Sequence, residues 1–290
     1  MARRQRQLRK AGAAVGFVMA CGGWAVCGCS GSGASAQGAQ EAPGAPGAQA
    51  VGEVRGAAGR LVAAGSAEAR TAMEMASGGT RVTIRGEGVY DFGEGVGRLK
   101  VLLPQDPAGT RDRKPITELL APGALYMKNR GAGVPADKWV RVETGALSDG
   151  NLVTGGATDP YVAAEVLRGT RTAAYVGRTE VAGAPVRHYR GTADLGRAAR
   201  AAGGAAGRSL RAAAKGFATA EVPFDVYLDD DGRIRKLRHR FSFVNGQRGD
   251  TVAVTSTTLL YDFGVPVTVR LPAEDDIYAG KIADEPGGED

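Results

Sequence analysis

Apolar and polar residues alternate over long stretches of the second half of the chain, and this pattern predicts β-strands. The expected strands are residues 173–181, 185–194, 222–228, 233–244, 251–263 and 265–271. Shorter segments of the same kind occur in the first half, at 81–85, 98–103, 124–128 and 139–142. Asp231-Gly232 lies between two of the long segments, and this dipeptide favours the tight turn of a β-hairpin.

Three other segments have the features of helices. Residues 54–76 are rich in alanine with spaced Val, Leu and Met, and Asp159-Pro160 is a cap followed by a first-turn proline that starts a helix to about Leu167. Residues 195–216 are rich in Ala and Arg, with Gly203-Gly204 as an expected break. Antiparallel strands with helices inserted between them predict an α+β fold, in which helices pack on one face of a broad, curved sheet.

The first residues have the organisation of an export signal. Five basic residues come first: Arg3, Arg4, Arg6, Arg9 and Lys10. The uncharged stretch Ala11–Val26 that follows is shorter than the roughly 20 residues that a membrane-spanning helix needs. Residues 1–28 are therefore interpreted as a signal peptide.

The signal ends in Val26-Cys27-Gly28-Cys29, which resembles the bacterial lipobox. In that motif the last cysteine receives diacylglycerol on its thiol, and small residues before it let the peptidase hold an extended chain. The motif predicts cleavage before Cys29 and attachment to the membrane through diacylglyceryl-Cys29, on the extracytoplasmic face of the cell membrane. The alternative is an ordinary secretory signal cut near Ala34 or Ala36.

Cysteine and charge usage limit what the mature chain does. The three cysteines are Cys21, Cys27 and Cys29, so the mature domain has no disulfide, thiolate metal site or cysteine nucleophile. The chain has 37 Lys and Arg against 31 Asp and Glu; without the five basic residues of the signal, 32 remain against 31. A balanced charge argues against nucleic acid as a partner.

The mature chain divides into two parts. Residues 29–50 are mostly Gly, Ala, Ser, Gln and Pro and are expected to form a flexible tether. Residues 51–290 have the length of one domain.

Several stretches resemble the LppX/LprG lipoprotein family of actinobacteria, which is related in fold to the lipoprotein carrier LolA. They are Tyr175–Tyr189, with Glu180-Val181-Ala182-Gly183 and His188-Tyr189; Val222–Asp229 with Gly232-Arg233-Ile234; Tyr126-Met127-Lys128 with Trp139-Val140; and Asp262–Val269. The resemblance covers most of residues 53–278. This chain departs from the family pattern at Arg187, where threonine is usual, and at Tyr227, where tryptophan is commoner.

The resemblance implies a LolA-like half-barrel with helices across its concave face, enclosing an apolar cavity that carries lipids or lipidated molecules. The nine residues expected to face this cavity are Leu99, Val101 and Leu103; Phe224, Val226 and Leu228; and Leu237, Phe241 and Phe243. Val252 and Val254 share a further apolar strand face. A filled core gives the same pattern, so the sequence leaves core and cavity as alternatives.

Catalytic and metal chemistry have little support. The two histidines, His188 and His239, lie in expected strands, where a structural role is commoner than general base catalysis. The basic run 233–240 is either a solvated strand face or a contact for anionic headgroups. Asp229–Gly232 fits a hairpin turn better than a calcium loop, which needs a distal Glu. No catalytic residue, metal or cofactor is assigned.

Two functional hypotheses from different classes follow. In the first, the domain carries a lipid or lipoprotein ligand. In the second, it is an envelope sensor or protein-interaction module whose sheet contacts a membrane-protein partner. An enzyme is the third and least supported alternative.

Overall fold

The computed structural model describes residues 46–280 except 78–79, 105–113, 132 and 245–250. Residues 1–45, which include the predicted signal peptide, Cys29 and most of the predicted tether, lie outside the described residues. The described residues contain no helix that is long and apolar enough to cross a membrane.

The helices and strands alternate in blocks along the chain. The first block is α1 (Pro46–Ala63), β1 (Ser66–Ser77), β2 (Thr80–Asp91), β3 (Val96–Leu102), β4 (Ile116–Ala121), β5 (Ala124–Lys128) and β6 (Trp139–Glu143). The second is α2 (Pro160–Val166), β7 (Thr170–Val181), β8 (Ala184–Asp194), α3 (Leu195–Ala202) and α4 (Gly204–Gly216). The last is β9 (Glu221–Leu228), β10 (Ile234–Val244) and β11 (Thr251–Tyr261). Short 3-10 turns occupy Thr144–Ala146, Leu167–Gly169 and Glu274–Asp276.

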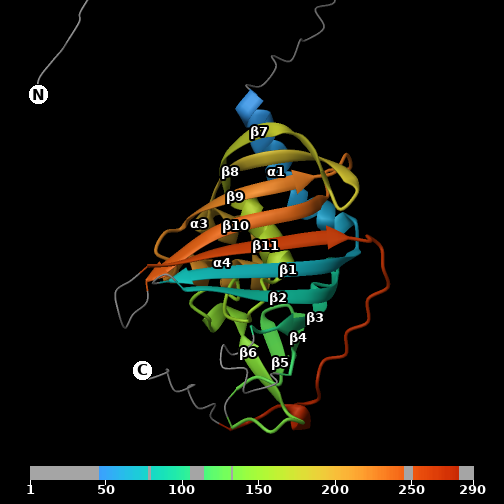
Figure 1. Ribbon diagram of the computed structural model, residues 1–290, viewed down its shortest axis with the longest axis vertical. Coiled ribbons are helices and arrows are strands. Elements are labelled where there is room, and N and C mark those ends of the chain that lie inside the picture. The colour runs from blue at the N-terminus through green and yellow to red at the C-terminus, as the bar shows by residue number, and fades with distance from the viewer. Residues whose placement is uncertain (1–45, 78–79, 105–113, 132, 245–250, 281–290) are drawn as a thin grey trace, which may run out of the picture. The chain divides into compact units, whose positions relative to one another are not determined.

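The strands of the described residues form one open sheet of eleven, in the order β6-β5-β4-β3-β2-β1-β11-β10-β9-β8-β7 (Figure 1). Strands β1 to β6 follow one another as neighbours, and so do β7 to β11. The antiparallel pair of β1 and β11 joins these two halves at the centre of the sheet. β6 and β7 are the two edges, and Ile277 of the C-terminal segment bridges to Trp139 of β6.

The four helices lie on one side of the sheet, which we call the inner face; the opposite side is the outer face (Figure 1). α1 contacts β7, α3 contacts β8, and α2 contacts β10. Side chains alternate between the two faces along each strand, as in β11, where Val252, Val254 and Leu260 are buried on the inner face. The predicted α+β fold class, with helices covering one face of an antiparallel sheet, is confirmed.

The prediction of one helix over residues 54–76 was wrong. α1 ends at Ala63, and Gly65 follows with a φ of +78°, which a glycine adopts without steric cost. The next residues form β1, which is hydrogen-bonded to a strand on each side, β2 and β11. Its Ala, Glu and Met residues are good helix formers, but intrinsic propensity is a small term that the two neighbouring ladders outweigh.

The prediction of a strand at 265–271 was also wrong, since these residues are not part of the sheet. Asp262 and Gly264 have positive φ angles that turn the chain out of β11. β11 and β1 are already paired on both sides, and Pro266 has no N–H to donate to a ladder. β4 was not predicted, because Ile116–Ala121 does not alternate: Glu118, Leu119 and Leu120 are all buried.

Helix boundaries follow local chemistry. The Asp159 carboxylate accepts hydrogen bonds from the N–H groups of Tyr161 and Val162, so the predicted start of α2 is confirmed. The expected break at Gly203 occurs: its φ of +64° separates α3 from α4. α1 begins at Pro46, so the last five residues assigned to the tether, 46–50, are helical.

Candidate functional site: the apolar layer between sheet and helices

The nine residues predicted to face a cavity all lie in one apolar layer beneath the helices. Seven of them are fully buried, and Leu103 and Phe243 are partly buried and pack against the same layer. β9 and β10 bring one group together, since Val226 is paired with Leu237. Leu99 and Val101 belong to β3, separated from β10 by β2, β1 and β11, whose inner-face side chains complete the layer.

The helices contribute much smaller side chains to this layer than the strands do. The buried apolar helix residues are Ala50, Val54, Ala57, Ala58 and Leu61 of α1; Val162, Ala163, Ala164 and Val166 of α2; Leu195, Ala198 and Ala199 of α3; and Ala206, Leu210 and Ala213 of α4. Burying a Leu or Phe side chain contributes about 1.5–3 kcal/mol, whereas each CH₂ group contributes about 0.8 kcal/mol. Alanine-rich helices are therefore held on the sheet by less apolar burial per residue than leucine-rich helices would be.

An irregular segment, residues 149–159, lies inside the layer. It touches the sheet where Thr158 Oγ1 is 2.5 Å from Ser256 Oγ, and it touches α4 where Gly150 approaches Ser209. The Asp149 carboxylate accepts hydrogen bonds from the N–H groups of Val153 (2.6 Å) and Thr154 (2.5 Å). The segment thus has its own internal support and separates part of the helix layer from the sheet.

Several buried polar atoms inside the layer have no hydrogen-bond partner among the described residues, and in two side chains this holds for both polar atoms. These two side chains are Glu118 of β4, for both carboxyl oxygens, and Asn151, for both amide atoms; each is fully buried. They converge on Gly155, where an added β-carbon would lie 3.1 Å from Glu118 Oε1 and 3.0 Å from Asn151 Oδ1. Burial raises the pKa of Glu118 well above its ordinary value, which favours the protonated form of this carboxyl. Buried polar groups of this kind need a partner.

A pocket of about 260 Å³ opens into the layer beside α2 and the junction of α3 and α4. Its aromatic wall contains Tyr90 and Phe92, with ring centroids 5.0 Å apart, and Tyr161, which stacks on Tyr90 at 6.5 Å. Asp159 lies in the same pocket. Burial raises the pKa of Asp159 to about 6, against the lowering effect of its hydrogen bonds from the N–H groups of Val162 and Tyr161.

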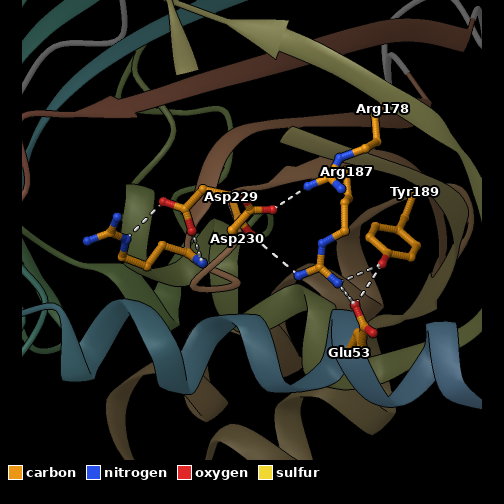
Figure 2. A network of polar contacts seen from close by, with 7 residues as sticks. Glu53, Arg178, Arg187, Tyr189, Asp229 and Asp230 are labelled. Atoms are coloured by element: carbon orange, nitrogen blue, oxygen red, sulfur yellow. Dashed lines mark hydrogen bonds and ion pairs between the residues drawn. The ribbon is translucent and has the colours of Figure 1, made fainter. Parts of the chain in front are cut away.

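α1 is fastened over the layer by a set of polar contacts that we call the latch: Glu53 of α1 with Arg187 and Tyr189 of β8 (Figure 2). Glu53 Oε2 accepts a hydrogen bond of 2.6 Å from Arg187 Nη1 and another of 2.6 Å from the Tyr189 hydroxyl. Arg187 also donates to the backbone oxygen of Asp229. Burial and the hydrogen bond to Glu53 raise the pKa of Tyr189 to about 12. The latch therefore joins the first helix to the β8 strand and to the turn between β9 and β10.

The latch was not identified from the sequence. Its residues are far apart in the chain, and strand alternation gives no indication that Glu53 meets β8. One available signal was Arg187 itself, which occupies the position where the resembled family usually has threonine.

The remaining residues singled out in the sequence have structural surroundings. His188 lies on the outer face, stacked on Tyr227 at 4.2 Å, with Nε2 2.9 Å from Asp225. Burial alone would raise the pKa of Asp225, but hydrogen bonds from Arg190 and His188 lower it below its ordinary value. His239 is buried on the inner face, and burial lowers its pKa to about 3, so it is neutral.

The Asp229–Gly232 segment forms the predicted hairpin turn. Gly232 donates its N–H to the backbone oxygen of Asp229 with a φ of +73°. The Asp229 carboxylate accepts hydrogen bonds from the N–H and Nε of Arg233. Within the part of the chain that the structure describes, no group of three or more His, Cys, Asp or Glu side chains is placed to hold a metal ion.

Of the nine predicted cavity residues, only Leu99 and Phe243 line any of five pockets that the described residues form. The layer is therefore closed over most of these nine side chains. Phe243 lines a pocket of about 180 Å³ at the end of α4.

No protein-family model and no curated protein matches the chain. Similar solved structures include lipoprotein LppX of Mycobacterium tuberculosis, with 10% identity over 77% of this chain and 99% of that one and a TM-score of 0.45. LprF of Mycobacterium bovis has 15% identity over 79% and 100%, with a TM-score of 0.38. A putative outer membrane lipoprotein-sorting protein domain of Vibrio parahaemolyticus has 10% identity over 79% and 96%, with a TM-score of 0.30. The LppX/LprG family, which the sequence motifs resemble, is represented among these structures by LppX.

Proposed function

We propose that this chain is a lipoprotein anchored through Cys29 to the extracytoplasmic face of the cell membrane, and that its domain binds lipid or lipidated molecules between the sheet and the helices. The observation that carries this proposal is the asymmetry of the apolar layer. The sheet contributes large side chains such as Phe224 and Phe241, while the helices contribute mainly alanine. Moving such helices away from the sheet exposes a broad apolar surface at a smaller cost than separating two layers of large side chains.

The unpartnered polar groups in the layer support a ligand with both apolar and hydrogen-bonding parts. In its protonated form the Glu118 carboxyl donates one hydrogen bond and accepts others, and the Asn151 amide does both as well. Neither has a partner among the described residues, although both are fully buried. A lipid places ester or headgroup oxygens beside its acyl chains, so it would satisfy these groups while filling the surrounding apolar space.

Copurifying lipid tests the binding proposal. The mature lipoprotein, extracted from membranes, is expected to retain noncovalently bound lipid in native mass spectrometry. α3 offers a matched pair of variants, because Ala199 is buried in the layer and Ala201 is exposed. Ala199→Phe should lower the lipid recovered, whereas Ala201→Phe should leave it unchanged. Wild-type protein that is repeatedly recovered empty contradicts the proposal.

The anchor has a separate test. Cys29→Ala removes the thiol that would receive diacylglycerol, so the domain should leave the membrane fraction and appear in the soluble fraction. If the variant still fractionates with the membrane, the assignment of Cys29 as the anchor is wrong.

A protein-interaction module is the second candidate, and the outer face of the sheet favours it. A groove of about 260 Å³ lies across β11, β1, β2 and β3, and its apolar residues include Leu102 and Leu259. Arg70, Arg85 and Lys100 line the same groove. Crosslinking in intact cells separates the two functions, because a sensor gives one dominant membrane-protein partner and a carrier gives several transient ones.

A further inference from the structure

β7 contains a bulge that exposes two neighbouring side chains. Tyr175 is paired with Tyr189 of β8 and Gly177 with His188, so Val176 has no partner in the ladder. Gly177 has a φ of +151°, a conformation that suits glycine. In a regular strand one of two consecutive side chains faces the core, but here Tyr175 is 53% exposed and Val176 is 52% exposed. They are the two most exposed large hydrophobic side chains of the described residues.

The bulge lies beside the first residues of α1. Tyr175 lines a pocket of about 280 Å³ together with Gln49, Ala50 and Glu53 of α1 and the latch residues of β8. Figure 1 shows the start of α1 next to β7. Sixteen residues separate Cys29 from Pro46. The Gly- and Ala-rich composition of this stretch predicts a flexible linker, for which this length gives a span of about 22 Å. An anchor at Cys29 would therefore keep this end of the domain close to the bilayer.

Positive and negative side chains pair with one another around the bulge, which argues against a partner recognised by its charge. Arg178 pairs with Asp230 at 2.5 Å, and Arg187 pairs with Glu53 at 2.6 Å (Figure 2). On the same strand, Arg171 and Glu180 have opposite charges. A partner that is recognised by charge has little to attract it here. Tyrosine and valine together suit the boundary between headgroups and acyl chains, where the ring lies at headgroup level and the aliphatic side chain reaches inward.

We infer that the Tyr175–Val176 bulge is a second membrane contact, which inserts into the interface of the bilayer that holds Cys29 and turns the pocket between α1 and β8 toward lipid. This inference rests on the anchor proposed above. Two side chains alone give weak binding, but an anchored domain meets the bilayer as an intramolecular partner, and a weak contact then suffices. The latch residues line this pocket, and they lie at the edge of the apolar layer. The membrane contact would therefore place that edge against the bilayer, where a lipid would enter.

The mature chain is well suited to a test by site-directed labelling. The full chain has three cysteines, at 21, 27 and 29; cleavage before Cys29 removes the first two and lipidation blocks the third, so Val176→Cys introduces the one free thiol. Leu271→Cys is a matched control, because Leu271 is 45% exposed and lies in the segment that leads to β6 at the opposite edge of the sheet. Each variant is labelled with the polarity-sensitive dye NBD and reconstituted as the lipidated full mature chain into phosphatidylcholine vesicles, with or without doxyl-labelled lipid.

The label at 176 is expected to show blue-shifted emission and quenching by doxyl lipid, and the label at 271 neither. Adding Tyr175→Ser to the Val176→Cys chain should reduce the quenching. An anionic lipid should leave it nearly unchanged, because the surrounding charges cancel.

Flotation of the same vesicles distinguishes a failure of the bulge inference from a failure of the proposed anchor. If the chain floats with the vesicles but quenching at 176 is no greater than at 271, the bulge is not a membrane contact and the anchor still holds. If the lipid-modified chain is not obtained and nothing floats, the anchor is refuted, and this inference fails with it.

Discussion

Glu53→Ala is the most informative single perturbation of the latch between α1 and β8. It removes the acceptor of two hydrogen bonds of 2.6 Å, one from the Arg187 guanidinium and one from the Tyr189 hydroxyl. It leaves the Arg55 side chain, which donates to the backbone oxygen of Thr170, as the other polar attachment of α1 at this edge. We therefore expect α1 to loosen at its start while the rest of the fold persists.

The expected size of the Glu53→Ala effect follows from the solvent exposure of the Glu53 and Arg187 side chains. Hydrogen bonds to charged groups contribute about 1.5–3 kcal/mol when buried, and exposed ion pairs about 0–1 kcal/mol. The side chains of Arg187 and Glu53 are 24% and 23% exposed, so solvent screens them only in part. Glu53→Ala is expected to reduce the opening free energy of α1 by about 1–2 kcal/mol. The matched control is Arg178→Ala, which breaks an ion pair whose side chains are 61% and 66% exposed and should cost less than about 0.5 kcal/mol.

Hydrogen exchange of the α1 amides measures this opening directly. Protection in α1 should fall in Glu53→Ala, while protection in the central strands β1 and β11 changes little. A double-mutant cycle with Arg187→Ala should show coupling, since the two residues share one bond. If Glu53→Ala changes α1 protection no more than Arg178→Ala does, the latch does not hold α1.

Three further predictions concern buried groups. Burial raises the pKa of Asp159 from 3.8 to about 6, so the stability that its proton provides is fully present below about pH 4 and is lost as the pH rises through 6. The unfolding free energy of Asp159→Asn relative to that of wild type should therefore be about 3 kcal/mol higher at pH 7 than at pH 4, as measured by urea unfolding. An equal difference at both pH values contradicts this. Glu118→Leu removes an unpartnered buried carboxyl, so it should raise the unfolding free energy of ligand-free protein by about 1–3 kcal/mol. The same variant should lower the amount of lipid recovered. A loss of stability with lipid recovery unchanged would count against the assignment of Glu118 to the ligand site. Phe224→Ala should cost about 3–5 kcal/mol in the same assay, because Phe224 is fully buried in the sheet side of the layer; a cost below about 1 kcal/mol would mean that the layer is loosely packed there.

The strands of the second half could be predicted from sequence because each one buries a single face. In β9, Phe224, Val226 and Leu228 are all on the inner face, and the alternation is visible in the residues themselves. β1 could not be predicted in this way. Its Ala and Met residues are common in helices, and only the ladders to β2 and β11, formed with residues up to about 190 positions away, make it a strand.

The candidate site was predictable in part for the same reason. Alternation identifies which side chains face inward, so it placed the nine apolar residues on the inner face; that they contact a ligand stays a prediction. It does not identify what covers them, and the alanine-rich faces of α3 and α4 carry little hydrophobic signal. Glu118 was missed because a buried carboxyl in a strand looks like an exposed one in sequence. Its burial depends on the segment 149–159, which packs over it from more than 30 residues away.

Lipid binding between the sheet and the helices can be tested directly by identifying the residues that a bound lipid contacts. A lipid with a photoreactive diazirine in its acyl chain is incorporated into membranes that hold the mature lipoprotein, and the crosslinked residues are identified by peptide mass spectrometry. Neighbouring residues of β10 face opposite sides, with Leu237 on the inner face and Arg238 on the outer face. Lipid bound in this layer should crosslink at Leu237 and Phe241 and on the buried faces of α1 and α3. Crosslinks confined to the outer face, beside Arg238 and Leu259, would contradict binding in this layer.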